Sequence, residues 1–245
     1  MLGMATTMDA VTTGVREITE ALGGGIHEGS LVLIEGETKT GKSVLCQHIA
    51  YGALSTRLSS VVYYSTEKGS EALLAQMDSM SLNVNHDFAT DRLRVYRMGN
   101  RDIFRDAAKS LQLIVNHIME LPKRFKVVIV DSPTIYMTSA SSVTKMDFLQ
   151  KCKELCEQNR TIIIVLDSHI IDNNTRYRAH AMSDYYLKLT SQDMMLAPGQ
   201  VDSRIVKVLE VTKLHGAERH AQPDLKFEIK PKIGIQILPL VQVRV

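Results

Sequence analysis

Short apolar runs alternate with longer helical patterns along the chain as far as Ser183. Each run is almost continuous in aliphatic side chains, which is typical of strands buried on both faces of a parallel sheet. The longer stretches between them are expected to form the crossover helices that connect parallel strands. We predict strands at Leu31–Ile34, Val61–Tyr64, Val127–Val130 and Ile162–Leu166, and helices near Lys42–Thr56, Ser70–Met80, Ile103–Glu120 and Val143–Gln158. The pattern indicates an α/β fold with a mainly parallel central sheet flanked by helices.

The pattern changes after Ser183, where strand-like runs follow one another without helices between them. This arrangement predicts an antiparallel C-terminal extension of the sheet. The runs are Tyr185–Leu189, Ile205–Thr212, Phe227–Ile229 and Ile235–Leu238, with a hairpin loop expected at Ala197–Asp202. The sequence contains no low-complexity tract, charge block or repeat. Residues 1–245 are therefore predicted to form a single domain.

Composition and charge exclude several classes of protein. Charged residues make up 23% of the 245 residues, and the formal net charge is +2 at pH 7. The chain thus lacks the strongly basic footprint of a dedicated nucleic-acid binder, and no direct nucleic-acid partner is expected. The N-terminal segment has no signal-peptide pattern, and the longest aliphatic runs are too short to cross a bilayer. We expect a cytoplasmic protein without a transmembrane segment.

The three cysteines are expected to be buried core residues and not disulfide partners or metal ligands. Cys46, Cys152 and Cys156 form no CxxC pair, and their odd number argues against a disulfide framework or a zinc knuckle. Cys152 and Cys156 lie four residues apart on one face of a predicted helix, where we expect two buried thiols. The late segment HGAERH has the wrong spacing for a zinc-protease motif, and Gly216 interrupts any helix there.

A phosphate-binding loop stands out at Gly36–Ser43. Its sequence GETKTGKS matches the pattern GxxxxGK[ST], and it follows a hydrophobic strand and opens a helix. Such a junction aims backbone N–H groups and the positive end of the helix at phosphate. A dinucleotide fingerprint is rejected, because the upstream glycines precede the strand. The predicted ATP-binding residues of this segment are Gly36, Thr38, Lys39, Thr40, Gly41, Lys42, Ser43 and Val44.

Three positions of the loop have specific roles in this interpretation. Lys42 is expected to reach the β- and γ-phosphates, Ser43 to bind Mg²⁺ through its hydroxyl, and Gly41 to allow close approach of the backbone. Lys39 is unusual in such a loop. It either adds a second cation beside the phosphates or extends into solvent, and we favour solvent.

Polar groups at the ends of three other predicted strands complete the candidate site. Asp131 follows four aliphatic residues and is expected to hold Mg²⁺ directly or through water, the alternative being an acidic cap after a buried strand. Glu67 follows the second strand and is either a general base or an acid that interacts with the next helix dipole. Among Asp167, Ser168 and His169 we expect a γ-phosphate sensor. His169 is the candidate, with an ordinary exposed histidine as its alternative.

Five segments taken in order resemble the KaiC branch of the RecA-like ATPases from about Gly14 to Leu240. They are ALGGGIHEGS, GETKTGKS, YYSTEKG, VVIVDSP, and VTKLHG followed by FEIKPKIGIQILP. The resemblance implies a RecA-like P-loop fold and self-association into a ring, a hexamer in this family. It also implies that Lys213, and with it His215, reaches the nucleotide site of a neighbouring subunit. Ile237 and Pro239 would then contact the adenine.

Within that branch, a single short domain with STE and VDSP is most similar to the accessory ATP-binding proteins of the archaellum motor. This resemblance implies ATP-dependent assembly with weak or no hydrolysis. It also implies docking on a motor ATPase and on a membrane-associated scaffold, hence a peripheral place at the cytoplasmic face of the membrane. Two departures matter. The family usually has two acids where this chain has Glu67 and Lys68, so Lys68 could pair with Glu67 and lower its pKa. Lys39 stands where such loops often carry a small residue.

Three functional hypotheses remain open at this stage. The first is an ATP-controlled assembly switch, and the second is an active ATPase or autokinase with Glu67 as its base. The third is a recombinase-type protein that forms filaments on DNA. The third has little support, because no basic segment interleaved with aromatic residues is present. The locally basic stretch Arg92–Arg105 is interpreted as a solvated face or a subunit contact.

Overall fold

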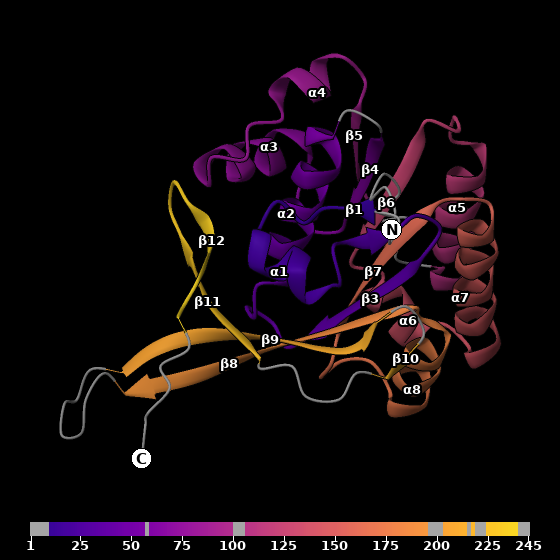
Figure 1. Ribbon diagram of the computed structural model, residues 1–245. Coiled ribbons are helices and arrows are strands. Elements are labelled where there is room, and N and C mark those ends of the chain that lie inside the picture. Colours follow the sequence, from indigo (N-terminus) through magenta and orange to yellow (C-terminus); the bar gives the residue numbers. More distant parts are fainter. Residues whose placement is uncertain are drawn as a thin grey trace, which may run out of the picture.

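A computed structural model describes residues 10–56, 59–99, 106–195, 203–214, 217–218 and 224–239. The dominant feature is one large sheet with helices on both faces (Figure 1). Along the sheet the strands follow the order β12–β11–β9–β8–β3–β7–β6–β4–β5, and β10 pairs with β9 off this path. The strands are β3 (Leu31–Gly36), β4 (Ser60–Ser65), β5 (Leu93–Arg97), β6 (Phe125–Asp131), β7 (Thr161–Asp167), β8 (Tyr185–Met195), β9 (Ser203–Leu214), β10 (Ala217–Glu218), β11 (Leu225–Lys230) and β12 (Gly234–Ile237).

Within the run from β8 through β3, β7, β6 and β4 to β5, each strand is parallel to the next. The four strands expected in this region are present, and β5 is an additional strand that the sequence analysis missed. Its side chains are mostly half-exposed, and only Leu93 is fully buried. Because β5 lies at the edge of the sheet and is only partly buried, it lacks the continuous apolar run by which the inner strands were recognised.

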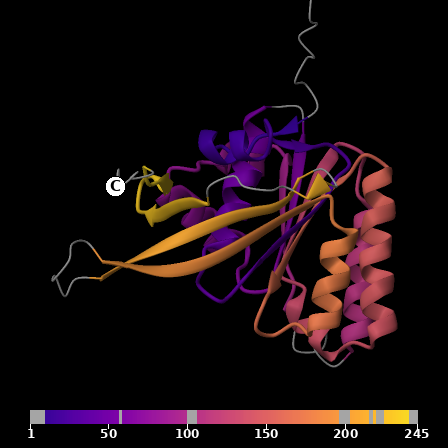
Figure 2. The same cartoon turned by 60° about the horizontal axis from the view of Figure 1, so that its bottom comes forward.

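The helices form two layers, one on each face of the sheet (Figures 1 and 2). Apolar side chains of α1, α2 and α3 pack on one face, and those of α5, α6, α7 and α8 pack on the other. All three cysteine thiols are free and buried in these layers, as expected for core positions. The helices are α1 (Arg16–Ala21), α2 (Lys42–Ser55), α3 (Ser70–Ser79), α4 (Asn85–Ala89), α5 (Ala107–Glu120), α6 (Thr134–Ser139), α7 (Ser142–Glu157) and α8 (Asn173–Met182).

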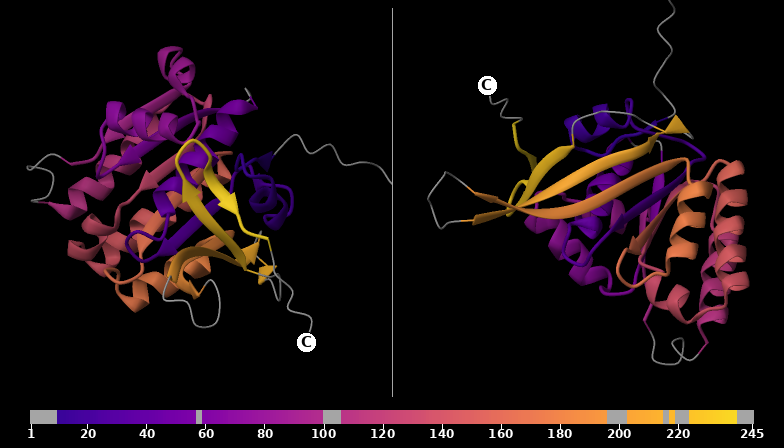
Figure 3. Two further views of the ribbon diagram at one scale, coloured as in Figure 1. Left: turned by 90° about the vertical axis from the view of Figure 1, so that its left-hand side faces the viewer. Right: turned by 90° about the horizontal axis from the view of Figure 1, so that it is seen from below.

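The predicted antiparallel extension is also present. Strand β8 is parallel to β3 on one side and antiparallel to β9 on the other, and β9, β11 and β12 continue the sheet in antiparallel pairs. The β8–β9 hairpin is long and projects from the body of the molecule (Figures 2 and 3). The expected hairpin loop at Ala197–Asp202 lies outside the described residues.

The C-terminal hairpin β11–β12 lies against the helices on the α2 side of the sheet. The backbone N–H of Ile235 donates to Nε2 of His48 in α2 at 3.0 Å. The backbone N–H of Lys232 donates to the carbonyl of Ser79 at the end of α3 at 2.7 Å. A separate two-stranded sheet, β1 (Ala10–Val11) with β2 (Ile26–His27), flanks α1. No helix among the described residues is long and apolar enough to cross a membrane.

Candidate nucleotide-binding site

The carboxyl ends of the parallel strands bring several of the predicted site residues together around one cavity of about 500 Å³. This is the edge of a parallel α/β sheet at which ligands bind. Its lining residues come from the loop after β3 with the start of α2, from the β4–α3 segment, and from the ends of β6, β7 and β11. They are Thr38, Lys39, Gly41, Lys42, Ser43, Val44, Thr66, Glu67, Lys68, Gln76, Asp131, Ser132, Asp167 and Ile229.

The loop between β3 and α2 has the backbone that its sequence predicts. Gly41 has φ +100° directly before the first turn of α2, a conformation that favours glycine. Lys39 also has a positive φ of 67°, and its side chain is exposed at the lining of the cavity. The buried Thr40 donates through its hydroxyl to the carbonyl of Glu37 at 2.8 Å, which ties the loop together internally.

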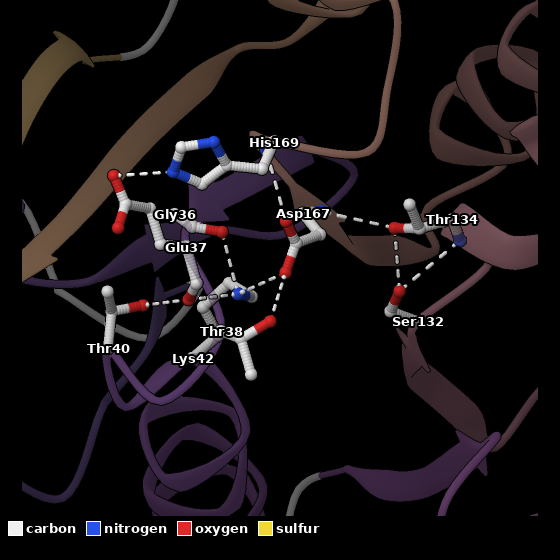
Figure 4. Close-up of polar contacts among 9 residues, drawn as sticks. All are labelled: Gly36, Glu37, Thr38, Thr40, Lys42, Ser132, Thr134, Asp167 and His169. Atoms are coloured by element: carbon white, nitrogen blue, oxygen red, sulfur yellow. Dashed lines mark hydrogen bonds and ion pairs between the residues drawn. The ribbon is translucent and has the colours of Figure 1, made fainter.

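Lys42 points its ammonium group back into the loop (Figure 4). The ammonium donates to the carbonyls of Gly36 at 2.7 Å and Glu37 at 2.6 Å, and lies 3.5 Å from Oδ2 of Asp167. These partners hold a cation beside the N-terminal end of α2, where the loop N–H groups and the helix dipole favour an anion. The loop therefore presents a lysine suited to bind phosphate.

Asp167, at the end of β7, is tied directly to the loop. Its Oδ2 accepts from the Thr38 hydroxyl at 2.9 Å, and its Oδ1 accepts from the His169 N–H at 3.1 Å. Burial acts to raise the pKa of Asp167, but these hydrogen bonds and the Lys42 charge outweigh burial and lower it. The Asp167 N–H donates to the Thr134 hydroxyl, which joins the ends of β6 and β7 (Figure 4). Asp167 thus connects the end of β7 to the phosphate loop.

His169 lies on the other side of that loop. Its Nε2 is 2.8 Å from Oε1 of Glu37, and both side chains are well exposed at 69% and 59%. His169 and Gly36 line a neighbouring cavity of about 260 Å³ and are not part of the lining of the larger one. The predicted sensor role of His169 therefore needs a rearrangement of this loop.

Asp131 and Ser43 form the candidate metal-binding pair. Asp131 is buried at the end of β6, where its Oδ2 accepts from the Tyr63 hydroxyl at 2.6 Å. Burial raises the pKa of Asp131, against hydrogen bonds from Tyr63 and Ser43 and the charge of Lys42. A carboxylate beside a hydroxyl offers the hard oxygen ligands that Mg²⁺ prefers, so the donor set fits this ion. With a bound nucleotide, Mg²⁺ would neutralise charge on its phosphates at this position.

Comparison with known proteins agrees with this geometry. A sequence model of the family described as "ATPase: KaiC" matches residues 11–242. This chain belongs to the KaiC family of ATPases.

The archaeal flagellar ATP-binding protein FlaH of Methanocaldococcus jannaschii is 28% identical over 229 residues, which cover 90% of this chain and 91% of that protein. The DNA repair and recombination protein RadB of Pyrococcus furiosus is 28% identical and covers 68% and 71% of the two chains. The crystal structure of M. jannaschii FlaH matches with a TM-score of 0.77 at 24% identity, over 94% and 99% of the chains.

In this KaiC-family chain Glu67 and Lys68 both line the cavity, but they do not form the predicted pair. Glu67 is exposed, and no ion pair joins it to Lys68 in the described part of the chain. The Lys68 ammonium donates instead to Oε1 of Gln76 in α3, and the Lys68 N–H donates to the Ser65 hydroxyl at 3.0 Å. Glu67 faces the cavity beside Asp131, and the negative charge of Glu67 helps to raise the pKa of Asp131.

Three other predicted residues lie outside the cavity of their own chain. The Lys213 ammonium in β9 donates to the carbonyls of His180 at 3.3 Å, Ala181 at 3.1 Å and Ser183, at the end of α8. Ile237 pairs with Phe227 across β11 and β12, and Pro239 follows as an exposed residue. None of Lys213, Ile237 and Pro239 belongs to the cavity lining, and His215 lies outside the described residues.

Two residues of the antiparallel extension reach the phosphate loop, and the sequence analysis missed both. Ile229 in β11 lines the cavity, and a Cβ added at Gly41 would lie 3.2 Å from its Cδ1. The Lys207 ammonium donates to the Lys39 carbonyl at 2.5 Å. Neither residue carries a motif, because their role comes only from the way β9 and β11 fold back toward a loop far away in sequence.

Proposed function

We propose that this protein is an ATP-binding assembly subunit of an archaellum motor, in which nucleotide occupancy controls ring formation and docking on the motor ATPase. It acts at the cytoplasmic face of the membrane through a membrane-associated scaffold, with weak or no hydrolysis. The observation that carries the proposal is the cavity lined by Lys42, Ser43 and Asp131, with one exposed acid, Glu67, followed by a lysine. The archaeal flagellar name of the FlaH relative supplies the biological setting.

Binding in this proposal uses residues with separate tasks. Lys42 supplies the charge for the β- and γ-phosphates, the loop N–H groups surround them, and Ser43 and Asp131 hold Mg²⁺. Switching does not require turnover, because ATP need only bind one conformation more tightly than another. A difference of a few kcal/mol between the two states is sufficient to shift the population.

Ring formation would explain the placement of the residues outside the cavity. Lys213, Ile237 and Pro239 do not line the nucleotide cavity of their own chain. In a hexameric ring, Lys213 would act at the site of the next subunit, and Ile237 and Pro239 would contact adenine at the interface. The hydrogen bonds of Lys213 at the end of α8 would then be exchanged for contacts across the interface.

The proposal is tested by measuring the mass of the assembly with and without Mg–ATP. We expect ATP to change the assembly of the wild type and not of Lys42→Ala, because the alanine removes the phosphate-binding charge. Lys123→Ala is the matched control, since Lys123 is exposed before β6, at the edge of the sheet opposite Asp131. An equal effect of ATP on wild type and Lys42→Ala would refute ATP-controlled assembly through this site.

An active ATPase is the second candidate, and the position of Glu67 at the cavity beside Asp131 favours it. Robust turnover that is lost in Glu67→Gln would support this function against a switch without hydrolysis. The RadB relative favours a DNA-binding alternative. Against it, Arg92 and Arg94 of the basic stretch are engaged with Asp87 at 2.6 Å and Asp91 at 2.7 Å. Salt-sensitive binding of single-stranded DNA would support the DNA-binding alternative.

A further inference from the structure

Lys68 is a half-buried cation on the lining of the nucleotide cavity, whereas Lys39 on the same lining is exposed. Lys42 lies beside Asp167, and Asp131 accepts from Tyr63. The Lys68 ammonium also lines the cavity, but its hydrogen-bond partner in the described structure is the neutral side-chain oxygen of Gln76. A cation whose charge is balanced by no carboxylate, in a cavity built for phosphate, is suited to bind an anion.

The partner of Lys68 is itself held by a buried group. Gln47 in α2 is fully buried, and its Nε2 donates to the same Gln76 oxygen at 2.8 Å. With two donors converging on it, the Gln76 oxygen keeps one hydrogen bond when Lys68 moves away. Releasing Lys68 to a ligand therefore leaves no unsatisfied oxygen on Gln76, and the cost of the release is small.

The order of strands places Lys68 toward the terminal phosphate. The phosphate loop follows β3, and the sheet continues through β7 and β6 to β4. Asp131 ends β6, and Lys68 follows β4, so Lys68 lies beyond Asp131 as seen from the loop. Ser43 and Asp131 would hold a metal ion that neutralises charge on the terminal phosphates of a bound nucleotide. A cation beyond that metal faces the γ-phosphate.

We propose that Lys68 is a second phosphate-binding cation of this site, which contacts the γ-phosphate and makes the protein distinguish ATP from ADP. The inference rests on the proposed function, because it assumes nucleotide binding in the same cavity. Without nucleotide, the Lys68 ammonium is held at the cavity wall by Gln76, which Gln47 holds in turn. With ATP bound, the ammonium turns from Gln76 to the γ-phosphate. With ADP bound, it stays on Gln76.

The test compares dissociation constants for Mg–ATP and Mg–ADP, measured by calorimetry on the full chain. Lys68→Gln should weaken ATP binding about tenfold through the loss of a charge-assisted hydrogen bond, and change ADP binding less than about twofold. Lys68→Arg should restore most of the preference for ATP. Gln76→Glu gives Lys68 a carboxylate partner and should also weaken ATP binding selectively. Lys123→Gln, at the opposite edge of the sheet, should leave both constants unchanged.

The outcomes separate the two proposals. Circular dichroism and the thermal midpoint of each nucleotide-free variant establish that it is folded. If Lys68→Gln and Gln76→Glu weaken ATP and ADP binding equally, or weaken neither, the γ-phosphate contact is refuted while nucleotide binding stands. If the wild type binds neither nucleotide, the proposed function fails, and this inference fails with it.

Discussion

At the scale of single residues, Asp131 shows how burial and hydrogen bonding oppose each other in this site. Its carboxyl group is buried at the end of β6, and burial raises its pKa. The hydroxyl groups of Tyr63 and Ser43 donate to the ionised form and partly offset that rise. The carboxylate is thereby kept in place for a cation, while protons compete for it at a higher pH than at an ordinary aspartate.

This competition predicts a pH dependence of nucleotide binding. Mg²⁺ needs the ionised carboxylate, so the Mg²⁺-dependent gain in ATP affinity should decrease as the pH falls through the raised pKa of Asp131. Affinity measured with Mg²⁺ and with EDTA at a series of pH values below neutral checks this. Asp131→Asn should lose most of the Mg²⁺-dependent gain at every pH. Any pH dependence that remains in this variant reports the protonation of ATP itself. An unchanged gain in Asp131→Asn would show that the metal is held elsewhere.

At the scale of elements, the contact between α2 and the C-terminal hairpin depends on one histidine. His48 is 3% exposed, and its Nε2 accepts from the Ile235 N–H. That bond requires Nε2 to be unprotonated, so the proton of the neutral ring lies on Nδ1. Nδ1 is buried without a hydrogen-bond partner in the described structure. Burial accordingly lowers the pKa of His48 to about 4.

We predict that His48 makes the protein less stable as the pH falls. The unfolded chain binds a proton at this histidine below about pH 6.5, whereas the folded chain binds it only near pH 4. The contribution to the free energy of unfolding should therefore decrease between those values, by about 3 kcal/mol in total, and level off below them. Urea unfolding across this range measures the decrease. In His48→Gln the free energy of unfolding should decrease less over this pH range than in the wild type. His86→Gln alters an exposed histidine, and its decrease should match that of the wild type.

At the scale of the whole molecule, the nucleotide cavity joins parts of the chain that are far apart in sequence. Its lining comes from the loop after β3 with the start of α2, from the segment after β4 with α3, from the ends of β6 and β7, and from β11 of the antiparallel extension. These strands belong to one continuous sheet that runs from β5 to β12. A ligand in the cavity therefore stabilises the parallel part and the extension together.

This arrangement predicts one cooperative unfolding transition that ATP shifts as a unit, in agreement with a single domain. Mg–ATP at about 100 times its dissociation constant should add about 2.7 kcal/mol to the free energy of unfolding, which corresponds to roughly 5–10 °C for a chain of this size. Calorimetry of wild type and Lys42→Ala checks the shift, which should be absent in the variant. Two transitions, of which ATP moves only one, would contradict a single domain.

Much of the fold could be predicted because its signals are local. The inner strands are buried on both faces, so their sequences are almost uninterrupted aliphatic runs, as in Ile162–Leu166. The edge strand β5 was missed because Arg94 and Arg97 interrupt its apolar residues and most of its side chains are half-exposed. From the sequence alone Lys68 could pair with Glu67, but its ammonium donates to Gln76, because α3 brings that side chain to the cavity wall.

The sequence by itself determined the phosphate loop, because Gly41, Lys42 and Ser43 are consecutive residues at the start of α2, and their roles follow from that local position. It also determined that Asp131 ends a buried strand. Only the tertiary structure decided what surrounds these groups. Ile229 lies next to Gly41, and Gln47 contacts Gln76. These contacts depend on the order and direction of the strands, which no local pattern encodes. Side chains separated by many residues become neighbours only when the whole sheet has formed.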